Sequence, residues 1–262
     1  MRTIVVTGSA SGIGAATKRR LEAGGDRVVG VDLRDAEVIA DLSTVEGRRA
    51  AVDGVRALAG AVIDGLVTCA GVAGLTDRPG SLVASVNYFG TVALLDALRP
   101  PLARGAQPAA VAISSNSTTI QPAVPVELTQ RCLAGDEDGA RALADEATAL
   151  MAYPATKLAV AWWVRRHAPT AAWAGAGIAL NAVAPGKVET PLLDETRADR
   201  VIGELVDSLP MPVGRSGTPD EIAALVAFLL GPDARFLCGS VVFCDGGTDA
   251  QLRPDDFPAP MG

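Results

Sequence analysis

The fold is decided by the stretch Thr3-Ile4-Val5-Val6-Thr7-Gly8-Ser9-Ala10-Ser11-Gly12-Ile13-Gly14 near the start of the chain. Its first five residues are all β-branched and predict a buried strand, and an Ala-rich segment of helical character follows Gly14. A glycine-rich turn between a strand and a helix lets backbone N–H groups approach a pyrophosphate. Since a lone glycine triplet can also be a simple tight turn, the residues around it must support this interpretation.

The next predicted strand supports dinucleotide binding. Arg27–Asp32 ends in an aspartate, close to the distance at which an acidic residue meets an adenosine ribose. The Asp32 carboxylate can accept from the 2'-hydroxyl of NAD and would repel the 2'-phosphate of NADP. Arg34 argues the other way, because its guanidinium could reach that phosphate. The balance favours NAD.

Outward from this turn, short β-branched runs alternate with longer Ala/Leu-rich segments, the pattern of βαβ units and a parallel sheet. We predict an α/β fold, a Rossmann-type doubly wound sheet forming one domain over residues 1–250, with a tail over 251–262. The expected strands are Thr3–Thr7, Arg27–Asp32, Gly65–Cys69, Ala109–Ser114, Ile178–Val183 and Ser240–Cys244, with a short extra strand near Ile39–Leu42.

Two helix starts and one insertion stand out. Ser43-Thr44-Val45-Glu46 is predicted to be a capping box, and Thr218-Pro219-Asp220-Glu221 adds proline at the first helical position. The irregular segment of about 116–152, with Pro122 and Pro125 before its helical runs, predicts an inserted helical hairpin.

Composition excludes several classes of protein. Of 262 residues, 49% are hydrophobic and 20% charged, which excludes a disordered chain, and the net charge of -7 disfavours nucleic acid as a partner. The longest apolar run, Ile222–Leu230, is too short to span a bilayer, and no signal peptide is visible, so we expect no membrane partner and a cytoplasmic location. One histidine and four cysteines without a C-x-x-C pair predict no metal site and reduced, buried thiols.

Tyr153-Pro154-Ala155-Thr156-Lys157 carries the chemistry. We expect it to begin a helix, with Pro154 in the first turn, so that Lys157 lies one turn above Tyr153 on the same face. There an ammonium favours the phenolate and lowers a phenol pKa of about 10, as hydride chemistry on an alcohol or ketone requires. Alone, such a pair is more often plain helix surface.

The ordered set of motifs resembles the short-chain dehydrogenase/reductase family over nearly the whole length. The matching elements are the TGSASGIG turn, Asp32, Asp41-Leu42, Cys69-Ala70-Gly71, Asn87 in SVNYFG, Ser114-Ser115, YPATK, Pro185-Gly186 with Thr190, and Asp245-Gly246-Gly247.

The resemblance implies roles for individual residues. Tyr153 would be the general acid/base, Lys157 would bind the nicotinamide ribose and tune Tyr153, Ser115 would orient the substrate oxygen, and Asn87 would support a water-mediated proton path. Ser114 would be structural. The residues implied to bind NAD are Gly8, Ser11, Gly12, Ile13, Gly14, Asp32, Asp41, Leu42, Cys69, Ala70, Gly71, Tyr153, Lys157, Pro185, Val188 and Thr190.

Two departures from the family pattern affect the site. Thr68-Cys69 stands where the family often has Asn-Asn, and 38 positions separate Ser115 from Tyr153, so the insertion sits beside the active site. The strings GIGAAT, DAEVIADLST, SVNYFG and ETPLL are most similar to the bacterial 3α-hydroxysteroid dehydrogenase/carbonyl reductase group.

The resemblance implies an NAD-dependent alcohol dehydrogenase/carbonyl reductase acting on a hydroxysteroid or another small apolar cyclic carbonyl compound. A 3-oxoacyl thioester reductase and a non-catalytic NAD sensor or scaffold are the alternatives. We expect a homodimer formed through Glu221–Leu230 and Ser240–Cys244. The apolar pocket is expected to use Ile120, Val126, Leu192, Leu193, Leu205, Val206, Leu209 and Met211.

Overall fold

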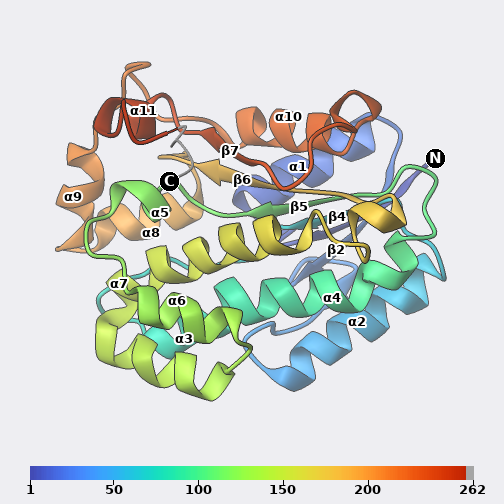
Figure 1. Ribbon diagram of the computed structural model, residues 1–262, viewed down its shortest axis with the longest axis horizontal. Helices are drawn as coiled ribbons and strands as arrows, with labels where there is room; N and C mark the ends of the chain where they lie inside the picture. Colours follow the sequence, from blue (N-terminus) through green and yellow to red (C-terminus); the bar gives the residue numbers. More distant parts are fainter. Residues whose placement is uncertain (258–262) are drawn as a thin grey trace.

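A computed structural model, which describes residues 1–257, shows a parallel sheet between two helical layers (Figure 1). The seven strands lie in the order β3-β2-β1-β4-β5-β6-β7. Their bounds are β1 Thr3–Thr7, β2 Arg27–Asp32, β3 Val38–Ile39, β4 Gly65–Thr68, β5 Ala109–Ile113, β6 Ala179–Pro185 and β7 Val241–Cys244. The predicted α/β doubly wound fold is confirmed, and β1 and β2 have the predicted bounds.

The short strand was predicted too late in the chain. It is formed by Val38–Ile39, where Val31 and Val38 are paired in register, and Ala40 N then donates to Asp32 O. The chain leaves the sheet there, so Asp41 and Leu42 follow the strand and are free to line a cavity.

Helices cover the two faces of the sheet. One face carries α1 (Gly12–Ala23) and α10 (Pro219–Leu229), and the other carries α2 (Val45–Ala59), α4 (Thr91–Leu102) and α7 (Glu137–His167), as Figure 1 shows. Each side has its own cluster of fully buried aliphatic side chains, because strands covered on both faces are apolar throughout. The remaining helices, other than α6, are α3 Gly80–Ala84, η1 Ser85–Gly90, α5 Ser117–Ile120, η2 Ala174–Ala176, α8 Pro191–Ala198, α9 Ile202–Ser208, η3 Pro232–Ala234 and α11 Thr248–Leu252.

One of the two predicted capping boxes is present. Thr218 accepts from Glu221 N while the Glu221 carboxylate accepts from Thr218 N, with Pro219 opening α10. The capping box at Ser43 to Glu46 was wrong: Thr44 is the cap and accepts from Gly47 N.

The segment 116–152 contains α5, α6 (Val126–Leu133) and the start of α7. The α6 helix lies along α7 (Figure 1), and Thr129 Oγ1 donates to Ala155 O at 3.1 Å. The expectation that a helix begins at Tyr153 was wrong. Helix α7 spans Glu137–His167 as two helical segments separated at Thr148, whose φ is +68°. The second segment begins directly after Thr148, so Pro154 lies beyond its first turn.

The segment Gly80–Leu102 is long and apolar enough to cross a membrane by length and composition. It consists of α3, the π-helix η1 and α4, and 61% of its most apolar window is buried inside the molecule. This degree of burial is typical of a helix in the core of a folded domain.

Candidate active site

A cavity of about 800 Å³ runs along the carboxyl ends of the strands. It lies across β1 and β4, where the strand order reverses, the position at which open α/β sheets bind ligands. Its lining extends from Asp32 at one end to Leu209 at the other and includes every residue predicted to be catalytic or to bind NAD, except Asn87.

The glycine turn leaves no room for side chains. A Cβ on Gly14 would lie 2.0 Å from Gly8 O, and one on Gly8 would lie 2.8 Å from Ala70 N. Gly8 also has a φ of +68°, where glycine is favoured. The turn is therefore packed directly on the loop after β4, and the N-terminus of α1 opens on the cavity.

The loop after β4 is held without the asparagine that the family often has. Ala70 N donates to Thr7 Oγ1 at 3.0 Å. Burial raises the pKa of the Cys69 thiol to about 12, with Lys157 and Thr17 opposing that rise. Cys69 is thus a neutral thiol at the cavity wall.

The Asp32 carboxylate sits at the far end of the cavity and is fixed by two backbone donors. Ala10 N donates to Oδ2 at 2.9 Å and Leu33 N donates to Oδ1 at 2.7 Å. Arg34 is exposed and does not line the cavity. The residues present therefore fit a dinucleotide, with a carboxylate at the ribose end and a helix N-terminus at the pyrophosphate.

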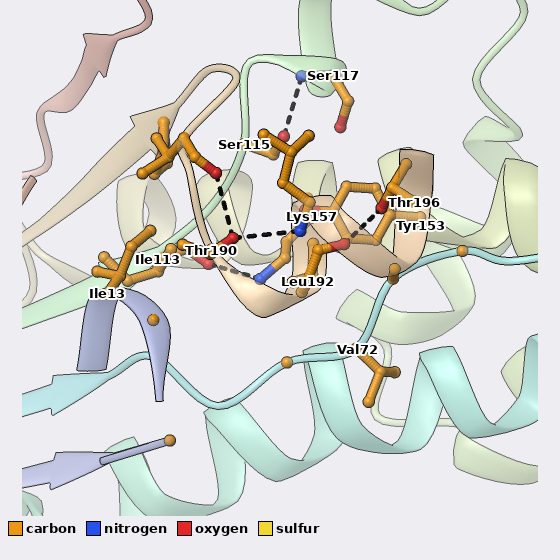
Figure 2. A pocket seen from close by; sticks show the side chains of 18 of the residues that line it. Ile13, Val72, Ile113, Ser115, Ser117, Tyr153, Lys157, Thr190, Leu192 and Thr196 are labelled. Carbon is orange, nitrogen blue, oxygen red and sulfur yellow. Dashed lines mark hydrogen bonds between the residues drawn. The ribbon is translucent and has the colours of Figure 1, made fainter. Parts of the chain in front are cut away.

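Three reactive side chains converge on the middle of the cavity, as Figure 2 shows. Tyr153 and Lys157 come from one face of α7, with the Lys157 Nζ atom 6.0 Å from the Tyr153 ring centroid. Ser115 follows β5, and its Oγ accepts from Ser117 N at 3.2 Å, which leaves the hydroxyl hydrogen free to donate. Ser114 is structural, because its Oγ donates to Lys157 O at 2.9 Å.

Burial shifts both titrating groups of this cluster away from their charged forms. It raises the pKa of Tyr153, while a hydrogen bond with Ser115 opposes the rise. It lowers the pKa of Lys157 to about 8. Lys157 Nζ also donates to Ile113 O at 2.9 Å, which fixes the amine beside the cavity.

Asn87 lies behind the cavity wall in the π-helix η1 and is fully buried. Its amide holds the Val72 backbone twice: Val72 N donates to Oδ1 at 2.8 Å, and Nδ2 donates to Val72 O at 3.0 Å. A Cβ built on Gly71 would lie 3.1 Å from Asn87 Oδ1 and 3.5 Å from Lys157 Nζ, so these three groups meet at one point.

The loop after β6 closes the opposite wall. Thr190 caps α8 by accepting from Leu193 N at 3.2 Å and donates to Val188 O at 3.2 Å (Figure 2). A Cβ on Gly12 would lie 3.3 Å from Thr190 Cγ2, so the glycine turn and the Thr190 loop face each other closely. Pro185 and Val188 line the same wall.

The half of the cavity beyond Tyr153 is where the apolar pocket was predicted. The predicted Ile120, Leu192, Leu193, Leu205, Val206 and Leu209 all line the cavity, and Leu82, Val86 and Leu150 add further apolar side chains to its wall. Two predicted members were wrong. Val126 is 51% exposed on α6, and Met211 lies beyond the lining, where its Sδ is 3.5 Å from Thr248 Oγ1.

The sequence analysis missed the contacts that hold α8 and α9 over this half. Asp199, between the two helices, accepts from Thr76 N at 2.8 Å and from Thr76 Oγ1 at 2.7 Å. Arg78 Nη2 donates to Glu195 Oε2 at 3.3 Å. These pairs lie more than 100 residues apart in sequence, and no local pattern marks them.

Within residues 1–257, no group of three or more His, Cys, Asp or Glu side chains is placed to hold a metal ion. All four cysteines are free thiols. The expectation that all are buried was right only for Cys132, since Cys69 and Cys244 are partly exposed and Cys238 is exposed.

Comparison with known proteins assigns the class. Residues 2–125 match the short chain dehydrogenase family, and residues 137–249 match a family described as enoyl-(acyl carrier protein) reductase. The chain belongs to the short-chain dehydrogenase/reductase family of oxidoreductases.

Several relatives match almost the whole length of the chain. It is 46% identical over 260 residues to 3-alpha-hydroxysteroid dehydrogenase/carbonyl reductase of Comamonas testosteroni, covering 98% of this chain and 100% of that protein. It is 33% identical over 256 residues to coniferyl-alcohol dehydrogenase of a Pseudomonas strain, covering 94% and 96%. The crystal structure of 3-alpha-hydroxysteroid dehydrogenase from Pseudomonas sp. B-0831 complexed with NADH superposes with a TM-score of 0.93 at 48% identity, covering 97% of this chain and 100% of that one.

Proposed function

We propose that the protein transfers a hydride between NAD and a secondary alcohol or ketone, with hydroxysteroids or other apolar cyclic carbonyl compounds as substrates. The observation that carries this proposal is one continuous cavity with Asp32 at one end, Ser115, Tyr153 and Lys157 in the middle, and an apolar chamber beyond them. The names of two relatives support it: one is a hydroxysteroid dehydrogenase/carbonyl reductase, and the other is a hydroxysteroid dehydrogenase whose crystal structure is a complex with NADH.

Each residue of the cluster has a task in that reaction. When bound, NAD supplies the hydride donor or acceptor. Tyr153 gives a proton to the carbonyl oxygen in reduction and takes it back in oxidation. Ser115 donates to the same oxygen, and Lys157 binds the nicotinamide ribose and stabilises the Tyr153 phenolate. Asn87 holds the loop before Val72 in place beside Lys157 and supports the proton path from there.

The cofactor residues divide along the cavity. The turn from Gly8 to Gly14 takes the pyrophosphate, and Asp32 takes the adenosine ribose. Asp41 and Leu42 border the adenine. Cys69, Ala70 and Gly71 underlie the cofactor, and the nicotinamide lies against Pro185, Val188 and Thr190.

The substrate preference follows from the apolar wall. Burial of apolar surface contributes about 25 cal/mol per Å². A fused-ring ketone therefore gains several kcal/mol over a small polar ketone, before the cost of closing the lid, formed by α8 and α9, is counted. Ser115 and Tyr153 need only one carbonyl oxygen to orient such a ligand.

The test is an assay that follows NADH absorbance with 3-ketosteroids, simple cyclic ketones and 3-oxoacyl thioesters. We expect kcat/KM to rise with the hydrophobic area of the ketone. Steroids that fail entirely, or small polar ketones that react equally well, contradict the pocket assignment but leave hydride transfer intact. Preferential reduction of a 3-oxoacyl thioester supports the alternative, although a net charge of -7 is unfavourable toward an acidic carrier protein.

We further propose a homodimer formed through α10 and β7. The strand β7 is an edge of the sheet, and Phe228 on α10 and Phe236 before β7 are 46% and 103% exposed. The helix α6 covers part of α7, the surface that relatives often use for association. A solution mass of one chain, or cross-links mainly through Trp162 and Trp163, counts against this dimer.

The free cysteines support a reducing, cytoplasmic compartment.

A further inference from the structure

A partly buried salt bridge joins α2 to the first turn of α7, and neither of its partners lines the cavity itself. Arg48 on α2 is 7% exposed. Its Nη1 donates to Glu137 Oε2 at 2.7 Å and its Nη2 donates to Glu137 Oε1 at 2.6 Å, in a bidentate pair. Glu137 opens α7, 89 residues later in the chain. Bidentate pairing fixes the guanidinium in both position and orientation.

The remaining hydrogen bonds of Arg48 go to backbone carbonyl oxygens rather than to side chains. Its Nε donates to Leu42 O at 2.8 Å, and its Nη2 donates to Ser43 O at 3.2 Å and to Ser85 O at 3.3 Å. Leu42 and Ser43 line the cavity at the end assigned to the adenine. Ser85 opens the π-helix that carries Asn87.

The segment that Arg48 holds has little free space around it. A Cβ on Gly47 would lie 1.8 Å from Asp41 O, and a Cβ on Gly90 would lie 3.1 Å from both Leu42 O and Leu42 Cβ. Residues 41–43 are therefore clamped between α2 and the π-helix. The Arg48 guanidinium is the group that binds two of their carbonyls at once.

We propose that Arg48 and Glu137 are a positioning pair that holds the adenine wall, Asp41–Leu42–Ser43, in its binding arrangement by anchoring it to the first helical segment of α7, which precedes the break at Thr148. The inference rests on the proposed placement of the adenine at this wall. It makes the N-terminal turn of α7, within the inserted segment, a determinant of cofactor affinity.

The pair should act on only one half of the cofactor. Loss of the Glu137 carboxylate leaves a buried guanidinium without its charged partner, so Arg48 will reorient and release the Leu42 and Ser43 carbonyls. If the adenine wall then has its binding arrangement in about one tenth of the molecules, the apparent Kd of a ligand that binds only to that arrangement rises about 10-fold. The nicotinamide contacts of Thr190, Tyr153 and Lys157 do not depend on that wall.

The experiment uses two half-cofactors with the full-length protein. Titration calorimetry measures the Kd of ADP-ribose, and steady-state turnover with reduced nicotinamide mononucleotide and a cyclic ketone measures the other half. The variant is Glu137→Gln. The matched control is Glu127→Gln, the same change on α6 at a side chain that is 73% exposed.

We expect Glu137→Gln to raise the ADP-ribose Kd about 10-fold and to leave turnover with the mononucleotide within twofold, with Glu127→Gln unchanged in both. An unchanged ADP-ribose Kd overturns the proposal, and so does a parallel loss of both readouts, which would indicate a general packing defect. If Glu137→Gln does not fold, Glu137→Asp, which keeps the charge, must show the same split at smaller size or the proposal fails. If the wild type binds no ADP-ribose, the placement of the cofactor itself is wrong, and this result is separate from the others.

Discussion

The cofactor half and the substrate half of the cavity are held together by different kinds of contact. In the cofactor half, backbone packs on backbone: a Cβ on Gly14 would meet Gly8 O at 2.0 Å, and a Cβ on Gly8 would meet Ala70 N. In the substrate half, the helices α8 and α9 are attached through side chains, such as Asp199 to Thr76 and Glu195 to Arg78.

The difference suggests that cofactor binding and substrate specificity respond differently to substitution. The glycine turn, in which backbone packs on backbone, loses its shape when almost any residue is substituted. The lid is held by polar side chains, so its apolar lining can change one residue at a time. Tyr153 and Lys157 lie where the two halves meet, on the segment of α7 that follows the break at Thr148.

The largest effect is expected at the junction. Tyr153→Phe removes the proton donor and should lower turnover by roughly 10² to 10⁴ while the Kd of NADH changes little. The matched control is Tyr88→Phe, the same loss of one oxygen at the other tyrosine of the chain, which is buried in the core. Stopped-flow turnover and NADH fluorescence titration measure both quantities. Turnover within a few-fold of wild type would remove Tyr153 from its role.

The next effect concerns the cost of burying Lys157. Its pKa is about 8 in the fold against an ordinary 10.5, so between these values the unfolded chain binds more protons and stability must rise with pH. Relative to Lys157→Met, the free energy of unfolding of the wild type should rise by about 2 kcal/mol between pH 7 and pH 9.5. Urea denaturation of both proteins at each pH measures the difference. A difference that is flat or falls with pH would show that the amine is not desolvated.

Sequence reasoning was accurate where short-range rules decide the structure. The run of β-branched residues set β1, the alternation of strands and helices set the sheet, and Thr218-Pro219 set the start of α10, because each of these depends on neighbours in the chain. The catalytic side chains were found through a family resemblance, and the structure adds that Tyr153, Lys157 and Ser115 share one cavity.

Sequence reasoning was inaccurate where contacts between segments far apart in the chain determine the structure. Pro154 lies inside a helix because the second segment of α7 already begins after Thr148, and this break lies where Gly74 and Gly80 bring other backbone onto α7. A Cβ on Gly80 would lie 1.9 Å from Ala144 O, and one on Gly74 would lie 2.4 Å from Ala149 O. No sequence period encodes such contacts. The same holds for Val126, which α6 turns toward solvent.

In the cofactor half, Asp32 should set the choice between NADH and NADPH. One like-charge contact at about 4 Å is worth between 1 and 4 kcal/mol, so Asp32→Ala should relax the preference for NADH by on the order of 10- to 100-fold. Arg34→Ala should leave the KM of NADH unchanged, since Arg34 lies outside the cavity lining. Paired kcat/KM values for the two cofactors decide the matter. A wild type that uses NADPH more efficiently would contradict the assignment of Asp32.

The smallest effect is expected in the lid, and it distinguishes the two halves most directly. Thr76→Val keeps the side-chain shape and the backbone bond from Thr76 N to Asp199 but removes the 2.7 Å bond from the hydroxyl. A single hydrogen bond of this kind contributes about 0.5 to 1.5 kcal/mol, so the KM of a large apolar ketone should rise roughly 2- to 10-fold. The KM of a small ketone and the Kd of NADH should not change, because neither needs α8 and α9 to lie closed over it. Thr170→Val, which removes a hydroxyl bonded only within its own turn, should change none of these values. If Thr76→Val weakens NADH and the large ketone equally, the lid and the cofactor wall move as one body, and the separation of the two halves is wrong.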